Sequence, residues 1–148
     1  MPIVLSLETS CDESAAALVS DEKGKIDLIG NEIASQIEEH AKWGGVVPEI
    51  ASRRHLEALP HLVEEALSDC GNSIEEIDAV ASTAGPGLIV CLSVGLSFGK
   101  AFASTINKPF IAVNHLEGHA LSPKLVTNLN FPYLVLLISG GHTQFLNV

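Results

Sequence analysis

Positively charged residues are scarce in this sequence of 148 residues, which has 8 Lys and Arg against 18 Asp and Glu. The formal net charge of −10 leaves no broad basic surface for the phosphate backbone of a nucleic acid. If the function involves nucleic acid, most of the basic surface must come from elsewhere.

Aromatic residues are also few, at 5%, although hydrophobic residues make up 47% and the mean hydropathy is +0.32. The core should therefore consist of aliphatic and small side chains, as in parallel sheets covered by helices. The length fits one ordinary domain or one lobe of a larger protein.

Cysteine is limited to Cys11, Cys70 and Cys91, without a Cys-x-x-Cys spacing. Any single disulfide would leave one thiol unpaired, so we expect a reduced, cytoplasmic protein. A signal peptide is not expected, because the start of the chain has no basic region and Glu8 interrupts the first apolar run.

The longest stretch without charge, 79–99, is not expected to cross a membrane, because Gly85-Pro86-Gly87 interrupts it. The pattern predicts a strand over 79–82, a glycine turn, and a helix over 88–105 whose start offers N–H groups to an anion. Neither the Walker nor the Rossmann glycine pattern is present.

Residues 3–7 and 15–19 are predicted to be the two strands of a hairpin. Their connection, 8–14, is rich in hydroxyls and carboxylates and includes Asp12 and Glu13, which are candidates for binding a metal or moving a proton. An ordinary acidic hairpin loop is the alternative.

A third strand is predicted over 26–37, followed by a loop over 38–47 and an amphipathic helix over 48–70. The cationic and histidine side chains of this helix are expected on its solvated side; they are Arg53, Arg54, His55 and His61.

His115 and His119 follow a short apolar strand predicted over 110–113. In a helix they would share one face, one turn apart, and could bind a single divalent ion. Ordinary surface or capping histidines are the alternative. At the carboxyl end of a strand, the pair would lie on the ligand-binding edge of an α/β sheet.

A polar connection over 123–132 precedes a strand over 133–138, a turn over 139–143 and a returning strand over 144–148. This second strand, turn and strand unit repeats the arrangement of the first hairpin. We therefore expect a first lobe over 1–130 and the first hairpin of a second lobe over 131–148.

The order of these elements resembles the actin, Hsp70 and sugar-kinase superfamily, with its ribonuclease H-like α/β lobe and mixed five-stranded sheet. Five motifs together resemble the tRNA threonylcarbamoyltransferase family, formerly described as O-sialoglycoprotein endopeptidases. They are Glu8-Thr9-Ser10-Cys11-Asp12-Glu13, Gly44-Gly45-Val46-Val47-Pro48-Glu49, Thr83-Ala84-Gly85-Pro86-Gly87, His115-Leu116-Glu117-Gly118-His119 and Ser139-Gly140-Gly141-His142-Thr143.

The resemblance implies transfer of a threonylcarbamoyl group from threonylcarbamoyl-adenylate to the exocyclic amine of the adenosine beside the anticodon, in tRNAs that read codons beginning with A. It implies one divalent metal, Fe²⁺ or Zn²⁺, on His115 and His119. In such a site we expect catalytic support from Asp12 and Glu13 in the first hairpin, through proton handling or the orientation of metal-bound water. The resemblance also implies partner proteins of the transfer complex, among them a homologous dimerisation subunit. The residues implied to bind the adenylate are Leu137, Ile138, Ser139, Gly140 and Gly141.

Members of that family are more than twice as long, so the resemblance implies an amino-terminal half that is inactive alone. Without the rest, two histidines leave the metal site open. A non-catalytic dimerisation paralogue is the alternative. A metalloprotease is disfavoured, because Glu117 does not directly follow the first histidine as the His-Glu-x-x-His motif requires.

Overall fold

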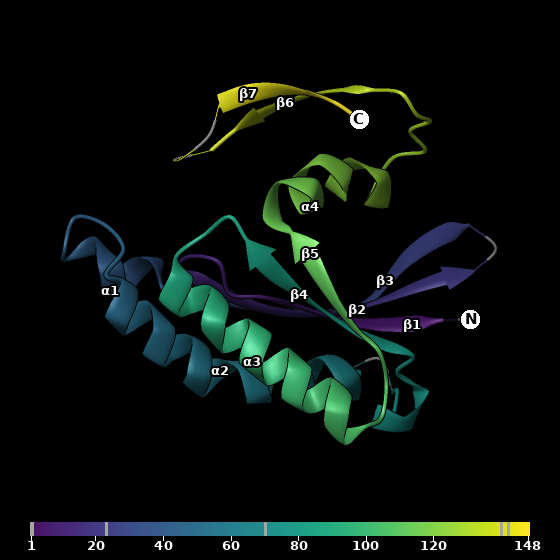
Figure 1. Ribbon diagram of the computed structural model, residues 1–148, viewed down its shortest axis with the longest axis horizontal. Coiled ribbons are helices and arrows are strands. Elements are labelled where there is room, and N and C mark those ends of the chain that lie inside the picture. Colours follow the sequence, from purple (N-terminus) through teal and green to yellow (C-terminus); the bar gives the residue numbers. More distant parts are fainter. Residues whose placement is uncertain (1, 23, 70, 140, 142) are drawn as a thin grey trace.

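The computed structural model describes residues 2–22, 24–69, 71–139, 141 and 143–148. A five-stranded sheet carries two long helices, and a separate two-stranded hairpin lies beyond a short helix (Figure 1). The strands are β1 (Ile3–Glu8), β2 (Glu13–Glu22), β3 (Lys25–Ser35), β4 (Ala79–Gly85), β5 (Phe110–Asn114), β6 (Leu134–Ile138) and β7 (Thr143–Asn147). The helices are α1 (Ile37–Ala41), α2 (Pro48–Asp69), α3 (Ile89–Thr105) and α4 (His115–Leu121), with 3₁₀ turns at Ile74–Glu76 and Ser122–Leu125.

The large sheet has the strand order β3-β2-β1-β4-β5. β1, β2 and β3 pair antiparallel as a meander, whereas β1, β4 and β5 run parallel. This mixed sheet confirms the architecture predicted from the sequence. The three parallel strands all end at the same edge, where α/β proteins bind their ligands.

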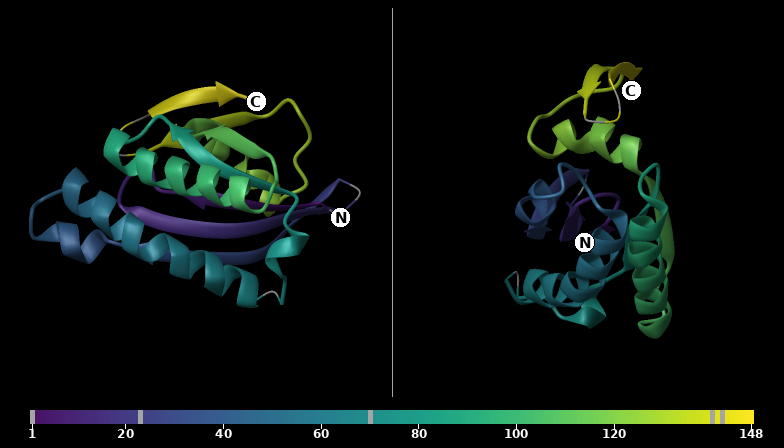
Figure 2. Two further views of the ribbon diagram at one scale, coloured as in Figure 1. Left: turned by 60° about the horizontal axis from the view of Figure 1, so that its bottom comes forward. Right: turned by 90° about the vertical axis from the view of Figure 1, so that its left-hand side faces the viewer.

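The helices α2 and α3 cover one face of the sheet (Figures 1 and 2). Alternate residues of β1 point into this layer, and Leu5 is fully buried there. The other fully or almost fully buried apolar side chains are aliphatic, as the low aromatic content predicts; among them are Leu18, Leu59, Ile77 and Val80. Burying each such side chain contributes about 1.5–3 kcal/mol.

Helix α3 packs against the end of β1 through its glycines. Gly95 N–H donates to Thr9 Oγ1, 3.2 Å away, and the Thr9 hydroxyl in turn donates to the carbonyl of Cys91, 2.9 Å away. A Cβ at Gly95 would overlap Thr9 Oγ1, and one at Gly99 would lie 3.0 Å from the Phe110 ring. The close packing of this helix is therefore made by its glycines, while its serines at 93 and 97 are exposed.

Two expectations, one about the segment before α2 and one about α2 itself, are wrong. Ile37–Ala41 is a short helix and not strand or loop. His55 is fully buried and not on the solvated side of α2, because both of its ring nitrogens form hydrogen bonds with the polar turn and the end of β3.

The two-stranded sheet β6–β7 lies on the far side of α4 from the large sheet (Figure 2). The Tyr133 hydroxyl donates to the carbonyl of Ala120 at 2.9 Å and ties this hairpin to α4. The division between 1–130 and 131–148 stays a prediction. Among the described residues, no helix is both long and apolar enough to cross a membrane.

Candidate functional site

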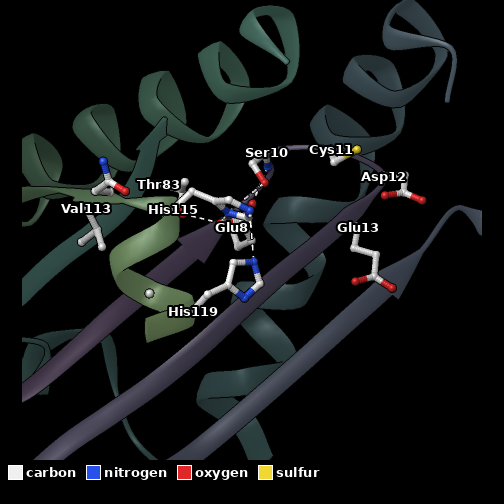
Figure 3. Close-up of a pocket in the computed structure, with 11 residues that line it drawn as sticks. Glu8, Ser10, Cys11, Asp12, Glu13, Thr83, Val113, His115 and His119 are labelled. Atoms are coloured by element: carbon white, nitrogen blue, oxygen red, sulfur yellow. Dashed lines mark hydrogen bonds and ion pairs between the residues drawn. The ribbon is translucent and has the colours of Figure 1, made fainter. Parts of the chain in front are cut away.

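The carboxyl ends of β1, β4 and β5 open onto a cavity of about 340 Å³ (Figure 3). β1 contributes Glu8, β4 contributes Thr83 and β5 contributes its last two residues, while the β1–β2 turn, the start of β2 and α4 form the remaining walls. The lining residues are Glu8, Ser10, Cys11, Asp12, Glu13, Thr83, Val113, Asn114, His115, Gly118 and His119. The sequence-predicted residues Asp12, Glu13, His115 and His119 are thus brought together at one edge of the sheet.

The helix that carries the two histidines starts at a polar cap. The side chain of Asn114 accepts hydrogen bonds from the N–H groups of Leu116 at 2.9 Å and Glu117 at 3.3 Å. An asparagine cap satisfies N–H groups that have no partner within the helix and fixes where the helix begins. His115 is therefore the first helical residue, and His119 lies one turn further along.

The Nε2 atoms of His115 and His119 lie 3.1 Å apart, and their rings meet edge to face. Two nitrogens bound at about 2.0–2.1 Å to one tetrahedral zinc are roughly 3.3 Å apart, so the pair fits as two ligands of one ion. Among the described residues, no three His, Cys, Asp or Glu side chains are arranged to hold a metal ion. The two histidines thus offer two of the ligands that a metal ion would need, and they face the cavity.

Glu8, which the sequence pattern did not single out as a site residue, contacts His115 at the edge of the cavity. Its Oε2 lies 3.7 Å from Nδ1 of His115 and accepts a hydrogen bond from the Thr83 hydroxyl, while its Oε1 accepts from the N–H of Ser10. Ser10 Oγ is 3.3 Å from the same Nδ1. With its proton on Nδ1 facing Glu8 and Ser10, His115 directs the lone pair of Nε2 toward His119. The position of Glu8 at the end of a parallel strand was the available signal.

Asp12 and Glu13 lie across the cavity from α4 (Figure 3). Asp12 is in the turn between β1 and β2, whose Cys11 thiol also lines the cavity, and Glu13 is the first residue of β2. Partial burial, together with a hydrogen bond to Asp12, raises the pKa of Cys11 to about 11. The Cys11 thiol is therefore mostly protonated near neutral pH and reacts slowly as a nucleophile.

Of the residues predicted to bind an adenylate, the four that the structure describes, Leu137, Ile138, Ser139 and Gly141, lie on or just after β6 and are not among the lining residues of this cavity. Leu137 is buried, whereas Ile138, Ser139 and Gly141 are exposed. Gly140 lies outside the described residues. Their role stays a prediction.

The TsaD family model, described as tRNA N6-adenosine threonylcarbamoyltransferase, matches residues 27–148. A curated protein of that description from Pelagibacter ubique (strain HTCC1062) is 59% identical to this chain, over 99% of this chain and 42% of the relative. In Prochlorococcus marinus (strain NATL1A) the identity is 60%, over 100% of this chain and 42% of the relative. This chain thus spans about two fifths of their length.

Solved structures resemble the fold at low sequence identity. A Pseudomonas aeruginosa protein with similarity to the peptidase YeaZ aligns over 100% of this chain and 65% of its own, with a TM-score of 0.64 and 18% identity. RuvC from T. thermophilus aligns over 82% of this chain and 71% of its own, with a TM-score of 0.51 and 15% identity. These likenesses show the fold alone and confirm the ribonuclease H-like class.

Proposed function

This chain belongs to the tRNA N6-adenosine threonylcarbamoyltransferase family, and we propose that its cavity is part of the active site of such an enzyme. The reaction moves a threonylcarbamoyl group from threonylcarbamoyl-adenylate to the N6 amine of the adenosine beside the anticodon, in tRNAs that read codons beginning with A. The observation that carries the proposal is the convergence of the two histidine Nε2 atoms, 3.1 Å apart, in a cavity that also holds Asp12 and Glu13.

His115 and His119 would hold one Fe²⁺ or Zn²⁺ ion, with Glu8 and Ser10 orienting the first imidazole. Two ligands leave the remaining coordination positions open, as a catalytic metal requires. When bound, the ion supplies Lewis acidity toward the phosphate or the carbonyl of the adenylate. The donor set suits both metals, because imidazole binds iron as well as zinc.

Asp12 and Glu13 are proposed to handle the proton of the attacking amine. The N6 nitrogen forms a bond to the carbamoyl carbon, the bond from that carbon to the phosphate oxygen breaks, and AMP leaves. The amine loses one proton, and a carboxylate across the cavity from the histidines is placed to accept it. General-base catalysis of this kind contributes about 10²–10⁴-fold in rate.

Two further assignments belong to the proposal. The adenylate would be held by the turn after β6, through Leu137, Ile138, Ser139, Gly140 and Gly141. The tRNA requires basic surface that a chain with a net charge of −10 does not supply. Partner proteins of the transfer complex, among them a homologous dimerisation subunit, and the remaining length found in the relatives would supply it.

The test is a transfer assay on a chimera that joins this chain to the remaining part of the Pelagibacter ubique relative. Labelled threonine is supplied as threonylcarbamoyl-adenylate and its incorporation into tRNA is followed, with the complete relative as the positive control. The chimera should transfer the label, and the H115A/H119A double variant should not. A chimera that folds like the relative but transfers nothing would contradict the proposal.

A further inference from the structure

A buried polar network lies behind the cavity, on the side of α2. The ring of His55 is fully buried, and its Nδ1 is 2.7 Å from Ser14 Oγ and 3.3 Å from Gln36 Nε2. Its Nε2 is 3.0 Å from the carbonyl oxygen of Cys11. Gln36 Oε1 lies 3.1 Å from Nε2 of His40, a second buried histidine.

The chemistry of these groups allows one assignment of protons that satisfies all of them. The Cys11 carbonyl can only accept, so His55 carries its proton on Nε2 and accepts at Nδ1 from Ser14 and Gln36. The amide oxygen of Gln36 then accepts from Nε2 of His40. Nδ1 of His40 accepts from the N–H of Val47 at 3.3 Å. Every ring nitrogen of the two neutral histidines therefore has a partner.

The network holds the backbone of the turn that lines the cavity. His55 donates to the carbonyl of Cys11, and the backbone N–H of Gln36 donates to the carbonyl of Asp12 at 3.0 Å. Ser14, two residues after Asp12, adds a further hydrogen bond between this turn and His55. These bonds fix the peptide planes on either side of Asp12, and hence the direction in which its side chain leaves the backbone.

We propose that His55 is a positioning residue, which holds the turn Cys11–Ser14 in its place at the cavity and links it, through Gln36 and His40, to the loop Lys42–Val47. The meaning of this role for catalysis rests on the proposed function. The network reaches this loop through the N–H of Val47, which donates to His40. The same loop carries Trp43, whose side chain is 61% exposed. A partner that displaced this loop would disturb the turn, because a partly satisfied buried network is unstable.

The test uses Cys11 as a reporter, since its thiol lines the cavity and its own carbonyl accepts the hydrogen bond from His55. The rate of its alkylation by N-ethylmaleimide is measured in this chain by peptide mapping, so that Cys70 and Cys91 are counted separately. Cys11 is an exposed residue, so loosening the turn acts on the ionisation of its thiol: it lessens the partial burial of the sulfur and separates it from Asp12, and that burial and Asp12 both favour the protonated form. His55→Gln should therefore speed alkylation at Cys11 by about tenfold, and Ser14→Ala by a smaller factor of about threefold. His40→Leu should give an intermediate increase.

Leu59→Val is the matched control, because Leu59 is buried on the same helix and has no polar group. It lowers stability without touching the network and should leave the Cys11 rate within about twofold of the wild type. If His55→Gln and Ser14→Ala label Cys11 no faster than Leu59→Val, the positioning role is overturned. Ser14→Ala removes one hydrogen bond and little volume, so the test stands even if the histidine variant does not fold.

A second readout separates positioning from general stability. In the chimera, His55→Gln should lower kcat for threonylcarbamoyl transfer by about tenfold or more and leave KM for tRNA unchanged. An equal loss in Leu59→Val would overturn the role. Alkylation of Cys11 needs neither metal, adenylate nor tRNA, so failure of the proposed transfer reaction would leave the labelling result standing.

Discussion

Glu8 and His115, which are far apart in the sequence, meet at the edge of the sheet, with Oε2 of the carboxylate 3.7 Å from Nδ1 of the imidazole. A carboxylate behind a ligating histidine fixes the orientation of the ring and raises its basicity. Glu8→Gln should therefore weaken binding of Zn²⁺ by about 10–100-fold, measured by competition with a chromophoric chelator.

Glu117→Gln is the control for this change. Glu117 is exposed and lies between the two histidines on their helix, and its substitution removes the same charge as Glu8→Gln. It should alter the affinity for Zn²⁺ by less than about threefold. Equal losses in the two variants would show that net charge, and not the contact between Glu8 and His115, governs the affinity.

Asp12→Asn and Glu13→Gln test the proton-handling role. Each replaces a carboxylate with a group of the same shape that cannot accept the proton of the amine. The substitution of whichever carboxylate accepts the proton should lower kcat of the chimera by about 10²–10⁴-fold and leave its metal content unchanged. Glu22→Gln, at the far end of β2, is the control. Full activity in both site variants would remove these carboxylates from the mechanism.

Gly95→Ala should destabilise the protein by about 1–3 kcal/mol in urea unfolding, although alanine is the better helix former. The added methyl group overlaps Thr9 Oγ1, which is held by its own hydrogen bonds to α3. Gly45→Ala serves as the control, because a Cβ there meets nothing within 4 Å. A stability equal to that of the wild type would mean that α3 does not pack this closely on β1.

His55 predicts a pH dependence of stability. Burial lowers the pKa of His55 below the ordinary value of 6.5. This effect is larger than the opposite effect of the Cys11 carbonyl and of the Glu8 and Asp12 carboxylates, which favour the charged imidazole. The nearby His40 also lowers the pKa. Below that ordinary value the unfolded chain binds more protons than the folded chain, so the free energy of unfolding falls as pH falls. The contribution is complete above about pH 7.5 and declines by at most about 1.4 kcal/mol per pH unit as the pH is lowered.

The measurement is urea unfolding of the wild type and His55→Gln between about pH 7.5 and 5.5. The wild type should lose stability more steeply than the variant over this range, because only the wild type takes up this proton on unfolding. Parallel curves would show that another group causes the dependence.

Much of the architecture could be predicted from local pattern. The alternation in β1, the polar turn before β2 and the glycine turn before α3 are strong signals, and each element formed where expected. The spacing of His115 and His119 also predicted two imidazoles on one helical face, and in the structure their rings meet one turn apart. These features depend on residues that are close in the sequence, so they can be predicted from a single sequence.

The missed features depend on contacts between distant segments. Glu8 was seen as part of a motif, but its contacts with Thr83 and His115 exist only once three strands lie side by side. His55 carries the same polarity as its exposed neighbours on α2, and only the partners from β2 and β3 allow it to be buried. Sequence reports the polarity of a side chain and not whether partners are present.

The most direct test of the account is the metal content of the chimera, measured by plasma mass spectrometry after purification without chelators or affinity metals. The account predicts about one iron or zinc per chain in the wild type and none in H115A/H119A, with both proteins equally folded by circular dichroism. The same metal content in the two proteins, whether one or zero, would contradict the assignment of His115 and His119 as ligands and the mechanism built on it.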